Sequence, residues 1–292
     1  MITPLVKLDT FGNITGDETL NVYAKLENKN PSGTTKYRTA RRMIDDAISS
    51  GKLKPGMTVI EHTSGNTGIA LAYIGRELGY PVTIIGGRRV TPEAKDIIRK
   101  YEAKLVEVDG WFIECEKKVN EIIRDKPDSY FWVQQGSNLI SLKSNFDLGM
   151  EIADQFQKQF NERIDIYLAS MGTGSTLTGV GRALNQRMKT RVGIVLPDGE
   201  YRFAGVDDKE ESTVPLPLYD PAILDEKLEI RIKEGVAIEA AKELHHVYGH
   251  YVGISAGADF AAAMEISKSE SGNAVIIFPD SGDRYASVLG VE

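Results

Sequence analysis

Short apolar runs alternate along most of this chain with longer stretches in which apolar residues recur at helical spacing. The short runs are rich in β-branched and aromatic residues, which is typical of buried strands. Strands are predicted at 21–27, 58–61, 81–85, 105–108, 130–133, 164–169, 191–196 and 274–278. Helices are predicted at 40–50, 69–78, 92–101, 111–124, 142–156, 177–188, 235–248 and 257–267. Strand–turn–helix units at this spacing predict an α/β fold with parallel sheets flanked by helices.

One segment interrupts this pattern. Residues 197–228 contain several prolines, many acidic residues and no clear period, so this segment is predicted to be irregular. No internal repeat or low-complexity tract accompanies it.

Composition and charge narrow the classes of partner. The net charge of −7 argues against a nucleic acid or an anionic membrane surface as the main partner. No apolar run reaches membrane-spanning length, and the N-terminus lacks a signal pattern. Cys115 is the single cysteine, so no intrachain disulfide can form, which fits a cytoplasmic protein. His246 and His250 have a metal-compatible spacing, but Gly249 between them weakens a helix there, and no metal site is expected.

The most suggestive stretch is the loop 30–38, in which Pro, Gly and hydroxyl residues lead directly to Lys36. Thr34 or Thr35 can serve as the N-cap of the helix that follows. A lysine at a helix start faces the positive end of the helix dipole, which favours a neutral, nucleophilic amine. Such an amine can form a Schiff base. Taken alone, the loop is equally compatible with a solvated lysine in a capped turn.

Two further loops each lie between an apolar strand and a helix. Gly172-Thr173-Gly174-Ser175-Thr176 has the glycines and hydroxyls of a phosphate-binding turn, although it matches neither the P-loop nor the dinucleotide fingerprint. Residues 63–68 (Thr-Ser-Gly-Asn-Thr-Gly) offer hydroxyls and helix-start amides that suit a carboxylate. Each loop alone could be a simple strand–helix connection. Ser281, after the last strand, could bind a ligand or cap a turn.

Taken in order, 31–36, 63–68, 172–176 and 279–285 resemble the pyridoxal-phosphate enzymes of fold type II, most closely the cysteine synthase group of O-acetylserine sulfhydrylases and cystathionine β-synthases. The resemblance covers nearly the whole chain. It implies a two-lobed, tryptophan-synthase-β-like α/β fold, with a smaller lobe at 38–145 and a larger lobe formed by 1–37 and 146–292. It also implies pyridoxal 5′-phosphate as cofactor and a homodimer.

The resemblance implies a role for each matching residue. Lys36 corresponds to the lysine that holds the cofactor as an aldimine and then moves the Cα proton. The residues implied to bind the substrate carboxylate are Thr63, Ser64, Gly65, Asn66, Thr67 and Gln135. Those implied to bind the cofactor are Lys36, Asn66, Gly172, Thr173, Gly174, Ser175, Thr176 and Ser281, the last facing the pyridine nitrogen. No metal is implied.

The activity implied is β-replacement on an activated L-serine, either O-acetylserine or O-phosphoserine, with sulfide to give L-cysteine through an aminoacrylate. A neutral serine opposite the ring nitrogen makes the ring a weaker electron sink, which favours loss of a β-substituent. Tyr37 replaces the usual Asp, Ser175 the usual Gly, and 215–221 the usual glycine-rich segment. The alternatives are therefore a cystathionine β-synthase, a Ser/Thr dehydratase, a diaminopropionate synthase or a catalytically silent cofactor-binding paralogue.

Overall fold

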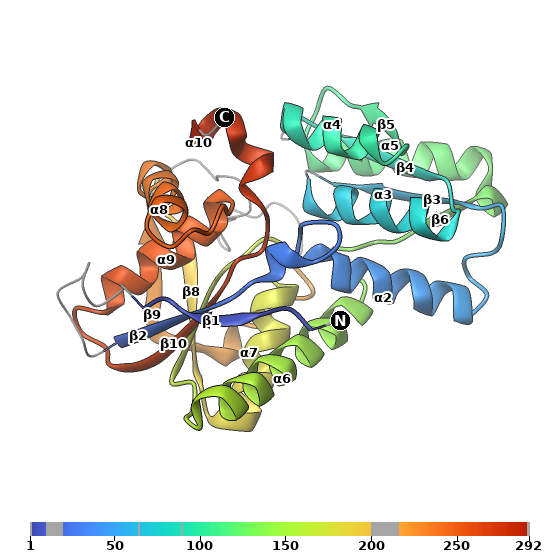
Figure 1. Ribbon diagram of the computed structural model, residues 1–292. Helices are drawn as coiled ribbons and strands as arrows, with labels where there is room; N and C mark the ends of the chain where they lie inside the picture. The colour runs from blue at the N-terminus through green and yellow to red at the C-terminus, as the bar shows by residue number, and fades with distance from the viewer. Residues whose placement is uncertain (1, 10–19, 64, 89, 200–215, 291–292) are drawn as a thin grey trace. The chain divides into compact units, whose positions relative to one another are not determined.

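The computed structural model describes residues 2–9, 20–63, 65–88, 90–199 and 216–290. Its contacts divide the chain into two compact units (Figure 1). Unit 1 comprises Met1–Lys29 and Leu142–Glu292, and unit 2 comprises Asn30–Ser141. The sequence predicts a smaller lobe at 38–145 and a larger lobe formed by 1–37 and 146–292. The bounds of these lobes stay a prediction.

Unit 1 is built on a six-stranded sheet with the order β1-β2-β10-β7-β8-β9. Only the β1–β2 pair is antiparallel, and every other neighbouring pair is parallel. The strands are β1 (Leu5–Lys7), β2 (Leu20–Lys25), β7 (Ile166–Ser170), β8 (Arg191–Pro197), β9 (Leu224–Ile232) and β10 (Gly272–Ile277). The predicted parallel α/β arrangement is therefore confirmed for this unit.

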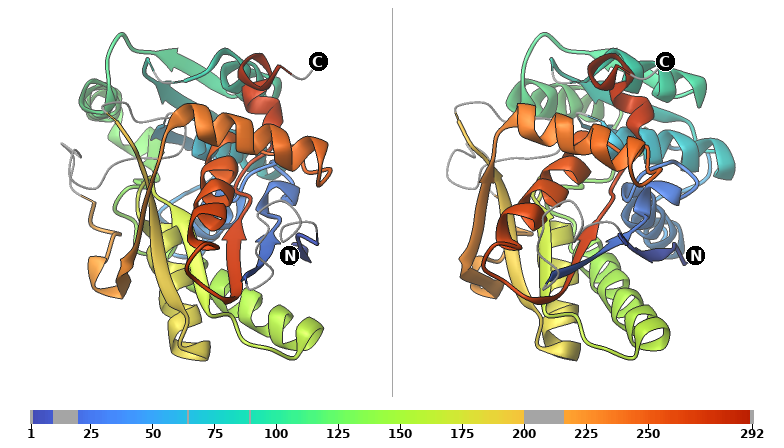
Figure 2. Two further views of the ribbon diagram at one scale, coloured as in Figure 1. Left: turned by 90° about the vertical axis from the view of Figure 1, so that its left-hand side faces the viewer. Right: turned by 60° about the vertical axis from the view of Figure 1, so that its left-hand side comes forward.

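Helices cover both faces of the unit 1 sheet. One face packs against α8 (Glu234–His246) and α9 (Ile254–Ile266), and the other against α6 (Ile140–Phe160) and α7 (Ser175–Met188) (Figure 2). Successive strand residues point to opposite faces, so Ile166 belongs to the first core and Tyr167 to the second. Short helical pieces are η1 (Glu27–Lys29), η3 (Pro221–Ile223), η4 (Gly282–Tyr285) and α10 (Ala286–Leu289).

Unit 2 has a four-stranded, fully parallel sheet with the order β5-β4-β3-β6. The strands are β3 (Thr58–His62), β4 (Val82–Gly86), β5 (Lys104–Glu107) and β6 (Tyr130–Trp132). Its helices are α2 (Lys36–Ser49), α3 (Asn66–Leu78), α4 (Pro92–Lys100), α5 (Phe112–Asp125) and the short η2 (Pro127–Ser129). Cys115 on α5 is buried, and burial is the larger cause that raises the pKa of its thiol, as fits a packing role.

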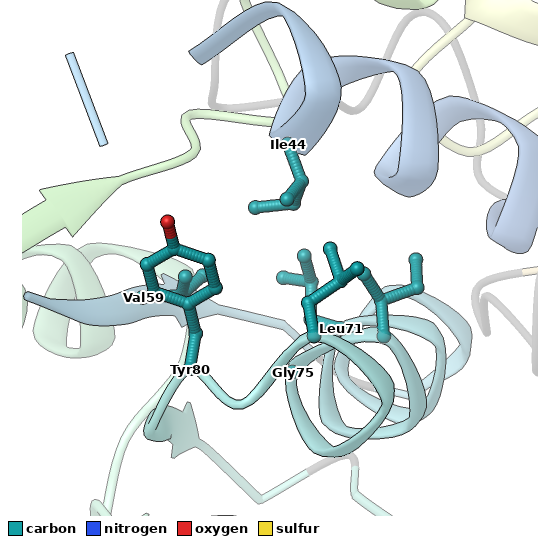
Figure 3. Close-up of a pocket in the computed structure, with 7 residues that line it drawn as sticks. Ile44, Val59, Leu71, Gly75 and Tyr80 are labelled. Carbon is teal, nitrogen blue, oxygen red and sulfur yellow. The ribbon is translucent and has the colours of Figure 1, made fainter. Parts of the chain in front are cut away.

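Unit 2 also holds a small apolar cavity between α2, α3 and β3 (Figure 3). It is lined by Ile44, Val59, Leu71, Ile74, Gly75, Leu78 and Tyr80. The cavity has no room for a water molecule, and its lining is almost wholly apolar, so it is a packing gap and no binding site.

One sequence expectation was wrong. The segment 197–228, predicted to be irregular, runs into β9, a nine-residue strand. Leu228, Ile230 and Ile232 are buried while Glu229 and Arg231 are not, which is the period-2 pattern of a strand at the sheet edge. The charged residues at the alternate positions of the strand obscured this pattern in the sequence. Residues 200–215 of the segment lie outside the described residues.

Two absences hold for the described part of the chain. None of its helices combines the length and the apolar character needed to cross a bilayer. Within the same ranges, no three His, Cys, Asp or Glu side chains gather as a metal site would require.

Candidate active site

The order of the unit 1 sheet identifies its ligand-binding edge. From β7 the chain continues to β8 on one side, whereas β10 lies on the other side of β7. The direction of winding therefore reverses between β7 and β10. In open parallel sheets, ligands bind outside the carboxyl ends of the strands at this reversal. The turn 172–176 follows β7 and Ser281 follows β10, so both lie at the predicted edge.

The turn after β7 has the geometry of an anion site. Gly174 has φ +80° and occupies the N-cap position of α7, which begins at Ser175. The Thr173 hydroxyl accepts a long hydrogen bond (3.4 Å) from the Ser175 amide. A Cβ added to Gly172 would meet no atom within 4 Å, so the backbone there borders open space. Exposed glycine backbone, two threonine hydroxyls and a helix N-terminus fit a phosphate group.

Ser175, which replaces a usual glycine, lies inward from this turn. It is 1% exposed, and its hydroxyl accepts a hydrogen bond of 2.9 Å from Asn145 Nδ2 on α6. Its side chain is therefore used for packing, and the backbone of the turn remains available to a ligand. The sequence reasoning missed Asn145, because the contact joins residues thirty positions apart.

The atypical segment 215–221 packs against the same turn where it is described. A Cβ at Gly174 would come within 2.5 Å of the Tyr219 Cβ and 2.8 Å of its Cα. The Asp220 amide donates to the Thr178 hydroxyl (3.0 Å), and Arg182 on α7 pairs with Asp220 (2.6 Å). The segment thus packs against the turn 172–176 and the first turns of α7, an arrangement that its sequence did not suggest.

Ser281 is the N-cap of the short helix η4, and its hydroxyl accepts a long hydrogen bond (3.4 Å) from the Asp283 amide. Its hydroxyl donates to Asp283 Oδ2 (2.6 Å), and its backbone forms an isolated bridge with Val252. The neighbouring Asp280 is fully buried and accepts from Arg284 (2.9 Å) and from the Tyr285 hydroxyl (3.0 Å). This buried cluster holds the backbone around Ser281 in place, while the serine itself remains half-buried.

In unit 2, Lys36 is the first residue of α2, and Thr35 is the N-cap position. The Thr35 side chain makes no capping hydrogen bond, whereas the Thr34 hydroxyl accepts one from the Lys36 amide (3.2 Å). Lys36 is half-buried. The expected helix start is therefore present, with Thr34 providing the hydrogen bond.

The loop after β3 is connected to Gln135 by hydrogen bonds. The Thr67 hydroxyl donates to Gln135 Oε1, and Gln135 Nε2 donates to the His62 carbonyl (3.3 Å). The Thr63 hydroxyl accepts from the Gly65 amide (3.3 Å), and Asn66 is the first residue of α3. Ser64 lies outside the described residues. The structure thus brings together Thr67 and Gln135, two of the predicted carboxylate-binding residues.

Glu61 is a residue of this site that the sequence reasoning missed. It is fully buried at the end of β3 and accepts hydrogen bonds from the amides of Gln135 (2.9 Å) and His62 (2.9 Å) and from Trp132 Nε1 (3.2 Å). A charged residue directly after two buried apolar residues of the strand was the available signal. Glu61 therefore links the end of β3 to Gln135, one of the predicted carboxylate-binding residues.

The charge states of this pair follow from burial. Burial raises the pKa of Glu61 to about 7 despite its hydrogen bonds, and burial lowers the pKa of His62 to about 4. His62 Nε2 lies 3.9 Å from Glu61 Oε1. Because the histidine loses its proton well below the pH at which the glutamate ionises, the two do not form an ion pair at any pH.

Glu61 should make stability depend on pH. Its folded-state pKa of about 7 lies above the ordinary value of 4.5, so the folded protein binds the proton more tightly. The contribution of Glu61 to the free energy of unfolding should then fall as pH rises from 4.5 to 7, whereas that of His62, whose pKa is lowered, rises up to its ordinary value of 6.5. Relative to wild type, Glu61→Gln should gain stability over this window and no further above pH 7, measured by urea unfolding at several pH values. A wild-type-minus-variant difference that is flat with pH would contradict this.

Known proteins resemble the chain over nearly its full length. The family model described as pyridoxal-phosphate dependent enzyme matches residues 2–280. Cysteine synthase A of Escherichia coli strain K12 is 35% identical over 304 residues, covering 98% of this chain and 91% of that protein. O-acetyl serine sulfhydrylase isoform 3 of Entamoeba histolytica is 31% identical with a TM-score of 0.85, covering 98% of this chain and 88% of that chain.

A hydrogen sulfide-producing enzyme of Fusobacterium nucleatum is 29% identical with a TM-score of 0.85, covering 97% of this chain and 96% of that chain. These similarities confirm the fold class expected from the sequence. The family match also confirms pyridoxal phosphate as the cofactor. The matched region includes the lysine loop, the turn 172–176 and the last strand. The chain therefore belongs to the pyridoxal-phosphate dependent enzyme family.

Proposed function

We propose that this enzyme replaces the β-substituent of an activated L-serine with sulfide and so forms L-cysteine. The observation that carries the proposal is the phosphate-binding turn after β7 together with Ser281 after β10, at the ligand-binding edge of a chain 35% identical to a cysteine synthase A. O-Acetylserine and O-phosphoserine are the two candidate substrates. When bound, pyridoxal phosphate supplies the electron sink that makes the Cα proton of an amino acid removable.

We assign the roles of the chain's own residues as follows. Lys36 binds the cofactor covalently and later takes up the Cα proton. The amides and hydroxyls of 172–176 bind the cofactor phosphate without a cationic side chain. Thr63, Ser64, Gly65, Asn66, Thr67 and Gln135 bind the substrate carboxylate, and Asn66 also reaches the cofactor's phenolic oxygen. Glu61 keeps Gln135 in position for this contact through the hydrogen bond to its amide.

Ser281 is assigned to the pyridine nitrogen. A serine hydroxyl cannot hold that nitrogen protonated as an aspartate would, because it carries no negative charge. The hydroxyl donates to Asp283 here, so it must turn from that carboxylate to donate to an unprotonated ring nitrogen. The assignment favours expulsion of a β-substituent over transamination.

The test is a spectral titration of the holoenzyme. O-Acetylserine, O-phosphoserine and serine are added in turn, and the visible absorption of the bound cofactor is recorded. The activated serine that is the substrate should shift the absorption, and sulfide should restore it with stoichiometric formation of cysteine. Absorption that no activated serine changes would contradict the proposal and would favour a cofactor-binding paralogue without catalysis.

A second candidate is release of hydrogen sulfide from cysteine. The likeness to the hydrogen sulfide-producing enzyme, at a TM-score of 0.85, favours it. Cysteine added to the holoenzyme should then generate sulfide in the absence of any other thiol. Replacing sulfide by homocysteine in the titration tests the cystathionine alternative, and pyruvate formation from serine tests the dehydratase alternative.

Gly174→Ala tests the phosphate-binding turn. The new Cβ would press on the Tyr219 backbone at a positive φ, so we expect a stability loss of about 1–3 kcal/mol and weaker cofactor binding. Gly172→Ala is the matched control for stability, because its Cβ meets nothing within 4 Å. The measurements are thermal unfolding and cofactor titration of the apoprotein. Equal stability of the two variants would show that Tyr219 does not constrain the turn.

We also infer a cytoplasmic homodimer. The resemblance to the cysteine synthase group supports the dimer, and the single, buried Cys115 fits a reducing compartment. Light scattering of the purified holoenzyme tests the dimer directly.

A further inference from the structure

The end of β7 has a strand neighbour on only one side. β8 pairs with β7 over the whole length of β7, from the pair Ile166↔Arg191 to the pair Ser170↔Val195. The pairing with β10 includes only Ala274↔Ile166 and Val275↔Tyr167. The two strands therefore separate toward their carboxyl ends. Any backbone amide that faces this gap needs an acceptor other than a strand.

Asp259 supplies that acceptor. It lies in the middle of α9, a helix of mostly small apolar residues, and is 2% exposed. Its Oδ1 accepts a hydrogen bond of 2.7 Å from the Ser170 amide. An acidic side chain is costly inside an apolar layer, so its presence there calls for a specific contact that offsets the cost. The hydrogen bond to the last residue of β7 is that contact.

Burial disfavours the charged form of this carboxyl group. Burial raises the pKa of Asp259 well above its ordinary value. Tyr167, three residues before Ser170 on β7, has a buried hydroxyl with no hydrogen-bond partner in the part of the chain that the structure describes. A neutral carboxyl group keeps one oxygen as an acceptor for Ser170 without placing a charge in this layer. An asparagine of the same size can do the same.

We propose that Asp259 is a positioning residue for the phosphate-binding turn. Ser170 precedes the turn by one residue, Met171, so the place at which the Ser170 amide is held sets where the amides of Gly172 and Gly174 point. Asp259 takes the place of the missing β10 partner and keeps this end of β7 from shifting. The inference rests on the proposed binding of the cofactor phosphate by the turn.

The test compares two replacements that match Asp259 in size. Asp259→Asn retains a neutral acceptor, and Asp259→Leu has the same shape with none. We expect the dissociation constant of pyridoxal phosphate for the apoprotein to stay within about 2-fold in the asparagine variant and to rise about 10-fold in the leucine variant, as the loss of one buried hydrogen bond implies. The turnover of the fully loaded leucine variant should remain within about 2-fold of wild type.

A second readout separates positioning from general stability. Hydrogen exchange of the Ser170 amide should be slow in wild type and in Asp259→Asn and faster in Asp259→Leu. Phe260→Leu is the matched control: Phe260 is fully buried beside Asp259 and packs edge-to-face on Tyr248, so the change should lower the melting temperature without changing cofactor affinity.

Two results would overturn the proposal: wild-type cofactor affinity in Asp259→Leu, or an equal loss of affinity in Phe260→Leu. The readout does not depend on the substrate. If cofactor titrations behave as expected but no activated serine reacts, the proposed function fails while Asp259 retains its role. If wild-type apoprotein binds neither pyridoxal phosphate nor inorganic phosphate, the role of the turn and of Asp259 fails.

Discussion

Replacing Lys36 with alanine should remove the visible absorption of the lysine-bound cofactor and reduce turnover at least about 10³-fold, the scale of a lost general base. Lys36 opens α2, and its amide is held by the Thr34 hydroxyl, so its side chain starts from a fixed point of the backbone. An alanine has neither the amine that attaches the cofactor nor the group that moves the Cα proton. Absorption spectra and cysteine formation at saturating cofactor measure both losses.

Two comparisons make this result specific. Lys36→Arg keeps the positive charge but has no amine that can attach the cofactor, so it should lose the same absorption and activity. Phosphate affinity should persist in both variants, because the turn 172–176 is unchanged. Retention of the absorption band and of turnover in Lys36→Ala would place the attachment on another lysine and would refute the assignment.

Features encoded in short stretches could be predicted from the sequence. The α3 and α4 helices, with Gly79 after the first and Pro92 at the start of the second, agree with their predicted bounds to within a few residues. The position of Lys36 at a helix start follows from the residues next to it. Local signals suffice here because capping and backbone preference act over one helical turn.

Features that depend on distant partners could not be predicted. Glu61 acquires its role from Gln135, Ser175 from Asn145, and Asp259 from the point where β7 and β10 separate. No periodicity in a single stretch records such a contact. The strand β9 was missed for a related reason, since its buried positions become visible only beside β8.

A second large effect is expected at Lys25, which the sequence placed in a strand without indicating that it is buried. Its side chain is fully buried, and its ammonium contacts Glu151 (2.5 Å), Gln155 (2.6 Å) and the Thr3 carbonyl (2.6 Å). These contacts tie the N-terminal strands to α6. Lys25→Met would leave the Glu151 carboxylate, whose side chain is only 16% exposed, without this ammonium.

We expect Lys25→Met to lower the free energy of unfolding by about 3–5 kcal/mol, the range for removing one partner of a buried pair. Lys268→Met is the matched control, because the Lys268–Glu265 pair has a similar length (2.6 Å) but exposed side chains, and its loss should cost about 0–1 kcal/mol. Adding Glu151→Gln to Lys25→Met should recover part of the loss, since it removes the buried charge. Urea unfolding measures all three variants, and equal losses for Lys25→Met and Lys268→Met would mean that burial adds nothing to this pair.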